Sequence, residues 1–497
     1  MQKRNELNVL ANVFSFVCCI VLCYFCCIRK NGILRSFLVR CNQSPVIMSM
    51  AKSSDFMLAS SNSMGVEKEI MARKVAIAED IIHELATEKY SLVSKRFDVT
   101  MRNALPISSL KQTWGALKSQ CGSFKRIIKI QTKQTNRFLD ISATCEFTLM
   151  PIDIKVAVNK DNKVCGLHFL AMEVSYETPS YVDIKAFDEI PVTIGVPPWT
   201  LPGVLSIPKG DGPFAVVVLV HGSGVHDRDE TINSNKPFRD LAWGLASRGI
   251  AVLRYDKRTY VYNSMFGKVD KNFTVNEETI EDVIAGVTFL RKQDRIDKNK
   301  IYILGHSMGG MLIPRIGLRE RSLAGFIIMG GNATPLEDLV VKQTEYLASF
   351  DGKISEEEKE SIEGIKKKAK DIKGLKLRDI DSTITLLFGA PPAYWLDLQK
   401  YDPAKLAREL RDPILILHGG RDYQISMEDF NQWKRELASK NKVKFILYPN
   451  LNHLFMEGEG KSGPLEYLKP SHVAEPVIID IAEWLILKSG TSNNVEK

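Results

Sequence analysis

A serine in the second half of the sequence has the surroundings of a catalytic nucleophile. Ser307 lies in the segment Gly305-His306-Ser307-Met308-Gly309, between an apolar run that predicts a strand and a segment that predicts a helix. A sharp turn with this spacing holds the serine in a strained conformation, and its glycines leave room for neighbouring backbone. The dipole at the helix N-terminus favours the negative charge that develops during attack on a carbonyl. We therefore predict that Ser307 is a nucleophile for acyl-group chemistry.

A serine hydroxyl is weakly nucleophilic and needs a base, which in turn needs an acid to orient it. His453 lies in a loop that follows the last predicted strand, and we expect it to be the base. Asp422 follows the preceding strand through a tight glycine turn, so it can fix the tautomer of the imidazole and stabilise its charged form. The sequence therefore predicts a Ser307-Asp422-His453 triad, with the acid between the serine and the histidine along the chain.

Other residues after Ser307 could take these parts but have less suitable places. His418 ends a strand, before an acid that could orient it, and His472 lies near the final helix, where we expect a surface or capping role. Asp412 precedes its strand and Asp429 lies inside a helix.

An oxyanion formed from the carbonyl would need two backbone N–H donors. One is expected from Met308, the residue after the nucleophile. The other is expected from the loop His221-Gly222-Ser223-Gly224, which follows an earlier strand. We predict the N–H group of Ser223, with that of Gly224 as the alternative, and a structural role for His221.

Charged residues are concentrated after two neighbouring strands. Asp227, Asp229 and Glu230 follow the oxyanion loop and could either line the mouth of the site or pair with other charges. The segment 254–258 (Arg-Tyr-Asp-Lys-Arg) lies at the end of the next strand. The order of the strands places it near the opening of the predicted site, and its role is left open.

The elements that must hold these residues are buried strands alternating with helices. The apolar runs are 216–220, 250–253, 301–304, 326–329, 414–417 and 443–447, after an opening hairpin at 192–207. Helices are expected near 236–248, 278–292, 308–319 and 427–439. Runs that are apolar throughout are typical of parallel strands covered on both faces, so residues 180–490 predict a doubly wound, mostly parallel α/β domain. The charged, helical stretch 335–408 interrupts this order and is expected to form a lid over the C-terminal edge of the sheet.

A smaller unit is expected at 66–172. A helical pattern begins at residue 66, a second helix surrounds Trp114, and alternating strands follow at 141–149, 152–158 and 164–169. Helices followed by antiparallel strands predict a small α+β domain. Its length and order resemble the cone-shaped domains related to nuclear transport factor 2, and also an uncharacterised domain that precedes a hydrolase in some bacterial proteins.

The set of motifs around Ser307, Asp422, His453 and the oxyanion loop resembles the α/β-hydrolase superfamily, over residues 180–490. It is most similar to the dienelactone-hydrolase-like and serine-aminopeptidase-like esterases. This resemblance implies an eight-stranded core sheet, hydrolysis of acyl esters through a covalent acyl-enzyme, and no cofactor. One departure is Pro314, which is expected to kink the helix after the nucleophile.

The first residues differ from the rest of the chain. Residues 1–41 contain six of the nine cysteines and carry a net charge of +5 of the total of +8, so the body is nearly neutral. A neutral body gives no footprint for nucleic acid, and its cysteine spacing favours neither a disulfide scaffold nor a metal site. The apolar segment 10–28 predicts a single membrane anchor, followed by a linker at 42–65. The alternatives are a cytoplasmic protein, if translation starts at Met48 or Met50, and a secreted one.

The leading hypothesis is a serine hydrolase that cleaves a small-molecule carboxylic ester. A serine peptidase of the aminopeptidase type or an acyltransferase could use the same triad, and Asp227, Asp229 and Glu230 could then grip a substrate amine. A protein that binds a ligand without catalysis is the alternative from another class.

Tyr394 and Trp395 of the lid are candidates for the wall of the substrate pocket, although a packed lid core would explain them equally well. The sequence predicts no oligomeric state.

Overall fold

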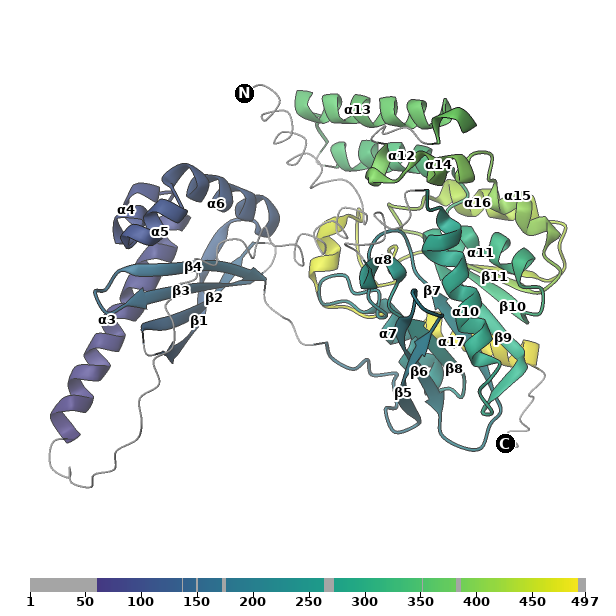
Figure 1. Ribbon diagram of the computed structural model, residues 1–497, viewed down its shortest axis with the longest axis horizontal. Coiled ribbons are helices and arrows are strands. Elements are labelled where there is room, and N and C mark those ends of the chain that lie inside the picture. The colour runs from purple at the N-terminus through teal and green to yellow at the C-terminus, as the bar shows by residue number, and fades with distance from the viewer. Residues whose placement is uncertain are drawn as a thin grey trace. The chain divides into compact units, whose positions relative to one another are not determined.

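The computed structural model describes residues 60–135, 137–148, 151–171, 176–262, 272–350, 352–380 and 386–489. These residues fall into two compact units, a small one that ends at residue 171 and a large one that begins at residue 176 (Figure 1). The predicted leader, with its anchor segment 10–28, lies outside the described residues, as do Met48 and Met50. In the ranges that are described, no helix is both long and apolar enough to cross a membrane.

The small unit is the predicted α+β domain. Its elements are α3 (Ser60–Ala86), α4 (Tyr90–Arg96), α5 (Val99–Ala104), α6 (Ile107–Cys121), β1 (Phe124–Gln134), β2 (Phe138–Phe147), β3 (Ile152–Asn159) and β4 (Val164–Ala171). The strands form an antiparallel sheet in the order β1-β2-β3-β4. Every second residue of β2 is buried, as its alternating pattern predicted. The edge strand β1 was not predicted, because most of its side chains are exposed and charged residues interrupt its apolar pattern.

The large unit is built on an eight-stranded sheet, in the order β12-β11-β10-β9-β7-β8-β6-β5. The strands are β5 (Phe187–Ile194), β6 (Leu201–Pro208), β7 (Phe214–Val220), β8 (Ala251–Tyr255), β9 (Ile296–His306), β10 (Gly325–Met329), β11 (Ile414–Gly419) and β12 (Val443–Tyr448). The hairpin β5–β6 is antiparallel, β6 pairs antiparallel with β8, and the remaining pairs are parallel. The predicted mostly parallel α/β-hydrolase sheet is therefore confirmed.

Helices cover both faces of this sheet, which explains the unbroken apolar runs. They are α7 (Pro237–Ala246), α8 (Arg258–Val261), a π-helical turn (Asn276–Ile280) leading into α10 (Glu281–Leu290), α11 (Met308–Arg319), α16 (Met427–Leu437) and α17 (Glu475–Ser489). Val216 and Val218 of β7 share a core with α10 and α11, whereas Val217 and Leu219 share one with α7 and α17. Figure 1 shows α10 and α11 on the near side of the sheet and α17 behind it. The helix α11 continues through Pro314 to Arg319.

The charged insertion lies between β10 and β11, as the sequence predicted. It contains α12 (Leu336–Ala348), α13 (Glu356–Lys373), α14 (Pro392–Leu398), α15 (Pro403–Leu406) and short 3-10 turns. In Figure 1, α12 and α13 lie together beyond one end of the sheet. The Tyr394 hydroxyl of α14 lies 3.5 Å from Sδ of Met308, and the Tyr401 hydroxyl donates to the Met311 carbonyl at 2.6 Å. The insertion therefore packs against the first turn of α11.

Candidate active site

Ser307 occupies the turn between β9 and α11, with a backbone conformation that residues other than glycine rarely adopt. Its φ is 54° and its ψ is −121°, and its N–H donates to the Met329 carbonyl at 3.0 Å. A Cβ at Gly305 would lie 2.3 Å from the Gly309 carbonyl oxygen, and one at Gly309 would lie 2.3 Å from the Val220 carbonyl oxygen. Since neither contact can be relieved without moving backbone, the turn requires glycine on each side of the serine.

Asp422 and His453 form a buried hydrogen-bonded pair. Oδ2 of Asp422 lies 2.7 Å from Nδ1 of His453, and Oδ1 accepts the N–H groups of Gln424 and Ile425. Burial by itself would raise the pKa of Asp422, but His453 and the N–H of Ile425 bring it below its ordinary value. Because the carboxylate is ionised, Oδ2 can accept a hydrogen bond from a proton on Nδ1 of His453.

This pair lies at the same edge of the sheet as Ser307. In the strand register, Met329 at the end of β10 is opposite His306 on one side and Leu417 on the other. A Cβ at the next residue, Gly330, would lie 3.5 Å from both Asp422 Oδ2 and His453 Nδ1. The three residues of the predicted triad therefore follow the C-terminal ends of β9, β11 and β12, on the same side of the sheet.

The predicted oxyanion loop lies beside the nucleophile. A Cβ at Gly222 would be 3.2 Å from Cβ of Ser307. The Gly222 N–H donates to Oε1 of Glu230 at 2.7 Å, and its carbonyl accepts from Nζ of Lys257 at 2.9 Å. His221 is buried, and burial lowers its pKa to about 3, so it is neutral. Its Nε2 lies 3.1 Å from the Asp227 carbonyl oxygen, which fits the structural role predicted for it.

Glu230 and His306 form a second buried pair that the sequence analysis did not identify. Nδ1 of His306 lies 2.8 Å from Oε2 of Glu230, and Nε2 lies 3.0 Å from the backbone oxygen of His453. Burial opposes the charge on each, but their mutual attraction outweighs it, so the pKa of Glu230 falls to about 2 and that of His306 rises. The signals in the sequence were a histidine directly before Ser307 and an acidic run after the oxyanion loop, but only the fold brings them together.

Three of the alternative acids and bases have other contacts. Asp429 accepts the N–H groups of Ala333 and Thr334. His418 stacks on Phe430, and His472 pairs with Asp240.

The carboxylates considered for gripping a substrate amine are engaged within the large unit. Asp227 accepts from the backbone N–H groups of Asp229 and Thr231, which closes its own turn. Asp229 pairs with Arg254, Lys236 and Arg239. With Glu230 bound to His306, these contacts favour the paired interpretation of the acidic run over an amine-binding one.

Tyr394 and Trp395, the candidates for the pocket wall, are both buried. The Tyr394 hydroxyl donates to Oε2 of Glu278 at 2.9 Å, and the Trp395 ring packs against Phe388. These contacts describe a packed insertion, and contact with substrate stays a prediction for both residues.

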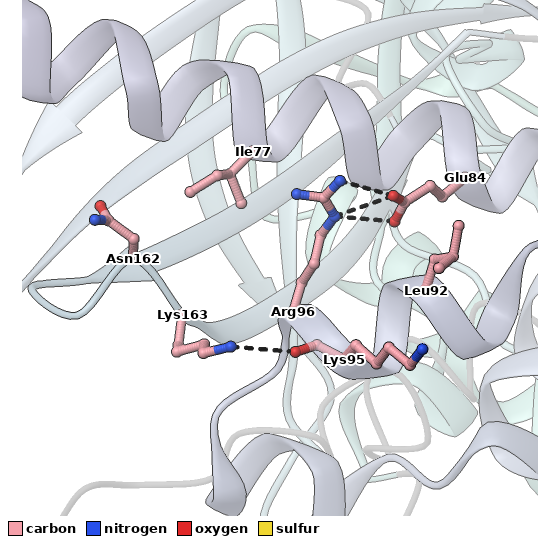
Figure 2. Close-up of a pocket in the computed structure, with 7 residues that line it drawn as sticks. All are labelled: Ile77, Glu84, Leu92, Lys95, Arg96, Asn162 and Lys163. Atoms are coloured by element: carbon pink, nitrogen blue, oxygen red, sulfur yellow. Dashed lines mark hydrogen bonds and ion pairs between the residues drawn. The ribbon is translucent and has the colours of Figure 1, made fainter.

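A separate hollow of about 260 Å³ lies in the small unit, between α3, α4 and the β3–β4 turn (Figure 2). Figure 2 shows the Arg96 guanidinium turned toward Glu84, at 2.8 Å, and Nζ of Lys163 bound to the Lys95 carbonyl. The side chains of Arg96 and Lys163 thus have protein partners. Across the described ranges, no cluster of three or more His, Cys, Asp or Glu residues is placed to hold a metal ion.

Comparison with known proteins gives matches for both units. Residues 217–461 match the alpha/beta hydrolase family, and residues 78–167 match a family described only as a protein of unknown function (DUF3887). The chain is 39% identical over 408 residues to esterase EstD of Thermotoga maritima, an alignment that covers 82% of this chain and 93% of that protein.

Among solved structures, Est1E from Butyrivibrio proteoclasticus is 17% identical, with 61% of this chain and 99% of that one covered and a TM-score of 0.40. The 2,6-dihydroxy-pseudo-oxynicotine hydrolase is 18% identical, with 60% and 67% covered and a TM-score of 0.38.

Proposed function

Because the chain belongs to the α/β-hydrolase family, we propose that it hydrolyses carboxylic esters through an acyl-enzyme formed on Ser307. The observation that carries the proposal is the strained serine at one edge of the sheet together with the Asp422–His453 hydrogen bond at the same edge. The similarity to an esterase over most of both chains supports ester hydrolysis in particular.

In the proposed first step, Oγ of Ser307 attacks the ester carbonyl carbon while Nε2 of His453 takes the hydroxyl proton. The carbonyl oxygen becomes an oxyanion, which the N–H groups of Met308 and Ser223 stabilise. Asp422 holds the imidazole in its Nδ1–H tautomer and stabilises the imidazolium. When the tetrahedral intermediate collapses, the C–O bond to the alcohol breaks and His453 returns the proton to the departing oxygen.

In the second step, water replaces the alcohol. His453 takes a proton from the water, whose oxygen attacks the acyl carbon and forms a second oxyanion at the same N–H groups. Collapse of this intermediate breaks the bond to Oγ, releases the carboxylic acid and returns the proton to Ser307. The cycle needs no group beyond the protein and water.

We expect Ser307→Ala to abolish hydrolysis of short p-nitrophenyl esters, since it removes the atom that forms the acyl-enzyme. A fluorophosphonate probe should label the unmodified protein and leave the Ala variant unlabelled. Asn452 lies next to His453, but Asn452→Ser would be a poor control. The Asn452 side chain accepts hydrogen bonds from neighbouring backbone N–H groups, which the substitution would disturb. Ser349→Ala, in the insertion, is a suitable match because it also removes one hydroxyl.

Full activity in the Ser307→Ala variant would refute the proposed nucleophile. A folded, unmodified protein that takes up no probe and cleaves no ester would instead favour the ligand-binding alternative. A panel of aminoacyl amides in the same assay separates an esterase from a peptidase.

A further inference from the structure

The peptide bond that follows Gly222 is fixed by a buried lysine. The Lys257 ammonium donates to the Gly222 carbonyl at 2.9 Å, and only 2% of the Lys257 side chain is exposed. Gly222 itself lies against Ser307, where a Cβ would come within 3.2 Å of the serine Cβ. The ammonium therefore acts on backbone directly beside the proposed nucleophile.

The geometry of a peptide bond links this contact to the oxyanion hole. A trans peptide is planar, so the carbonyl of Gly222 and the N–H of Ser223 belong to one rigid plane and point in opposite directions. When Lys257 holds the carbonyl, it also sets the direction of the N–H. A cation on the carbonyl oxygen also polarises the peptide and strengthens its N–H as a donor.

We propose that Lys257 is a positioning residue for the oxyanion hole, which aims and polarises the Ser223 N–H through the Gly222 carbonyl. This role rests on the proposed function, because it presupposes an oxyanion formed at Ser307.

The contacts of Lys257 hold its side chain in place. Nζ lies 2.7 Å from Oε1 of Glu278, and Oε2 of Glu278 accepts the Tyr394 hydroxyl of α14 at 2.9 Å. The chain of contacts thus runs from the insertion to the oxyanion loop. Buried ion pairs are often no more stabilising than apolar side chains of the same size, so stability alone does not account for a lysine at this place.

Gly222 is also held by a second hydrogen bond, which does not involve Lys257. Its N–H donates to Glu230, whose other oxygen pairs with His306. Loss of Lys257 therefore removes the hydrogen bond to the Gly222 carbonyl and leaves the hydrogen bond from the Gly222 N–H to Glu230 in place.

The test compares Lys257→Met with the unmodified protein on a p-nitrophenyl ester. Loss of one oxyanion donor lowers kcat by about 10²–10³-fold, so we expect a fall in kcat toward this range with little change in KM. The ester should be assayed beside its thiono analogue, in which sulfur replaces the carbonyl oxygen. Sulfur is a larger and weaker hydrogen-bond acceptor, so an intact oxyanion hole favours the oxygen substrate. The preference should decrease sharply in Lys257→Met.

Arg258→Met is the matched control. Arg258 is also buried and also paired with a carboxylate, as its Nε donates to Asp282 at 3.0 Å, but its described contacts do not include Gly222. It should keep the oxygen-over-sulfur preference of the unmodified protein. Lys257→Met leaves the buried Glu278 carboxylate without its lysine. If this single variant does not fold, the same measurements are made on the double variant Lys257→Met/Glu278→Gln, in which that carboxylate is neutralised.

Each outcome decides between the two proposals. If folded Lys257→Met or the double variant keeps the kcat and the oxygen preference of the unmodified protein, the positioning role is wrong while the esterase proposal stands. A lower kcat with an unchanged oxygen preference would also overturn it, since the lysine would then act on structure in general. If the unmodified protein cleaves no ester, both proposals fail together.

Discussion

His306 lies between Gly305 and Ser307 in the turn that holds the proposed nucleophile, and its side chain has contacts of its own. One ring nitrogen faces the Glu230 carboxylate and the other faces the His453 carbonyl oxygen. Glu230 and the His453 carbonyl raise the pKa of His306, which favours an imidazolium with a proton on both nitrogens. Since Glu230 also accepts the Gly222 N–H, this one pair holds backbone of both the oxyanion loop and the loop of the base.

A prediction at the residue scale concerns this pair and its dependence on pH. Glu230 has a pKa of about 2 against an ordinary 4.5, so its contribution to stability is present above 4.5 and is lost as pH falls toward 2. The pKa of His306 is raised above 6.5, so its contribution is full below 6.5 and is lost as pH rises through the raised value. Glu230→Gln should therefore cost most near pH 5.5, by about 3–5 kcal/mol if the pair behaves as other broken buried pairs do.

Urea unfolding of both proteins at acidic, intermediate and alkaline pH measures this difference. Glu356→Gln is the control, because Glu356 pairs with Lys359 on the surface with 83% of its side chain exposed, and such pairs contribute about 0–1 kcal/mol. A cost for Glu230→Gln that stays constant from acidic to alkaline pH would contradict the proposed charge state.

Single residues were predictable to different degrees. Ser307, Asp422 and His453 could be chosen because each follows a strand that the sequence marks by an unbroken apolar run, and the last two meet at 2.7 Å. Lys257 and Glu230 lie in charged segments that were noted near the mouth. Their partners could not be read from the sequence, because those contacts depend on where separate loops meet in space.

At the scale of elements, the buried strands of the large unit were predicted well because burial on both faces removes polar residues from them. The edge strand β1 (Phe124–Gln134) was missed for the opposite reason, since exposure allows lysine and glutamine along it. The short helices α4 and α5 were also missed. They are shorter than the span over which a helical period can be recognised.

The element-scale prediction concerns the contact between α11 and β7. Gly309 lets the first turn of α11 approach the end of β7 so closely that a Cβ would meet the Val220 and His221 carbonyl oxygens at 2.3 Å and 2.7 Å. Backbone cannot give way as a flexible side chain can, so Gly309→Ala should displace the helix, destabilise the large unit and remove ester hydrolysis. The matched variant is Gly364→Ala in α13, where a Cβ would meet nothing within 4 Å.

Replacing glycine by alanine inside an unstrained helix stabilises by about 0.4–1 kcal/mol, so Gly364→Ala should raise the unfolding midpoint slightly and leave the hydrolysis rate unchanged. Thermal unfolding and the p-nitrophenyl ester assay report both effects. If Gly309→Ala were as stable and as active as Gly364→Ala, the close approach of α11 to β7 would not be needed for the turn that holds Ser307.

At the scale of the whole molecule, the two units have separate hydrophobic cores. The core of the small unit lies between its helices and its antiparallel sheet, around Trp114 and Ile141. The cores of the large unit lie on the two faces of the eight-stranded sheet. Every residue of the proposed chemistry, from Ser223 to His453, belongs to the large unit.

The last prediction follows from this division. A shortened chain of residues 175–497 keeps the sheet, the insertion and both buried pairs beneath the site, and domains with a core of their own can fold alone. We expect it to fold and to hydrolyse p-nitrophenyl esters with a kcat comparable to that of the full chain, with the shortened Ser307→Ala protein as the inactive control. Circular dichroism and the ester assay on both lengths make the comparison. A shortened chain that folds but has lost its activity would contradict this prediction. It would show that the reaction needs residues before 175.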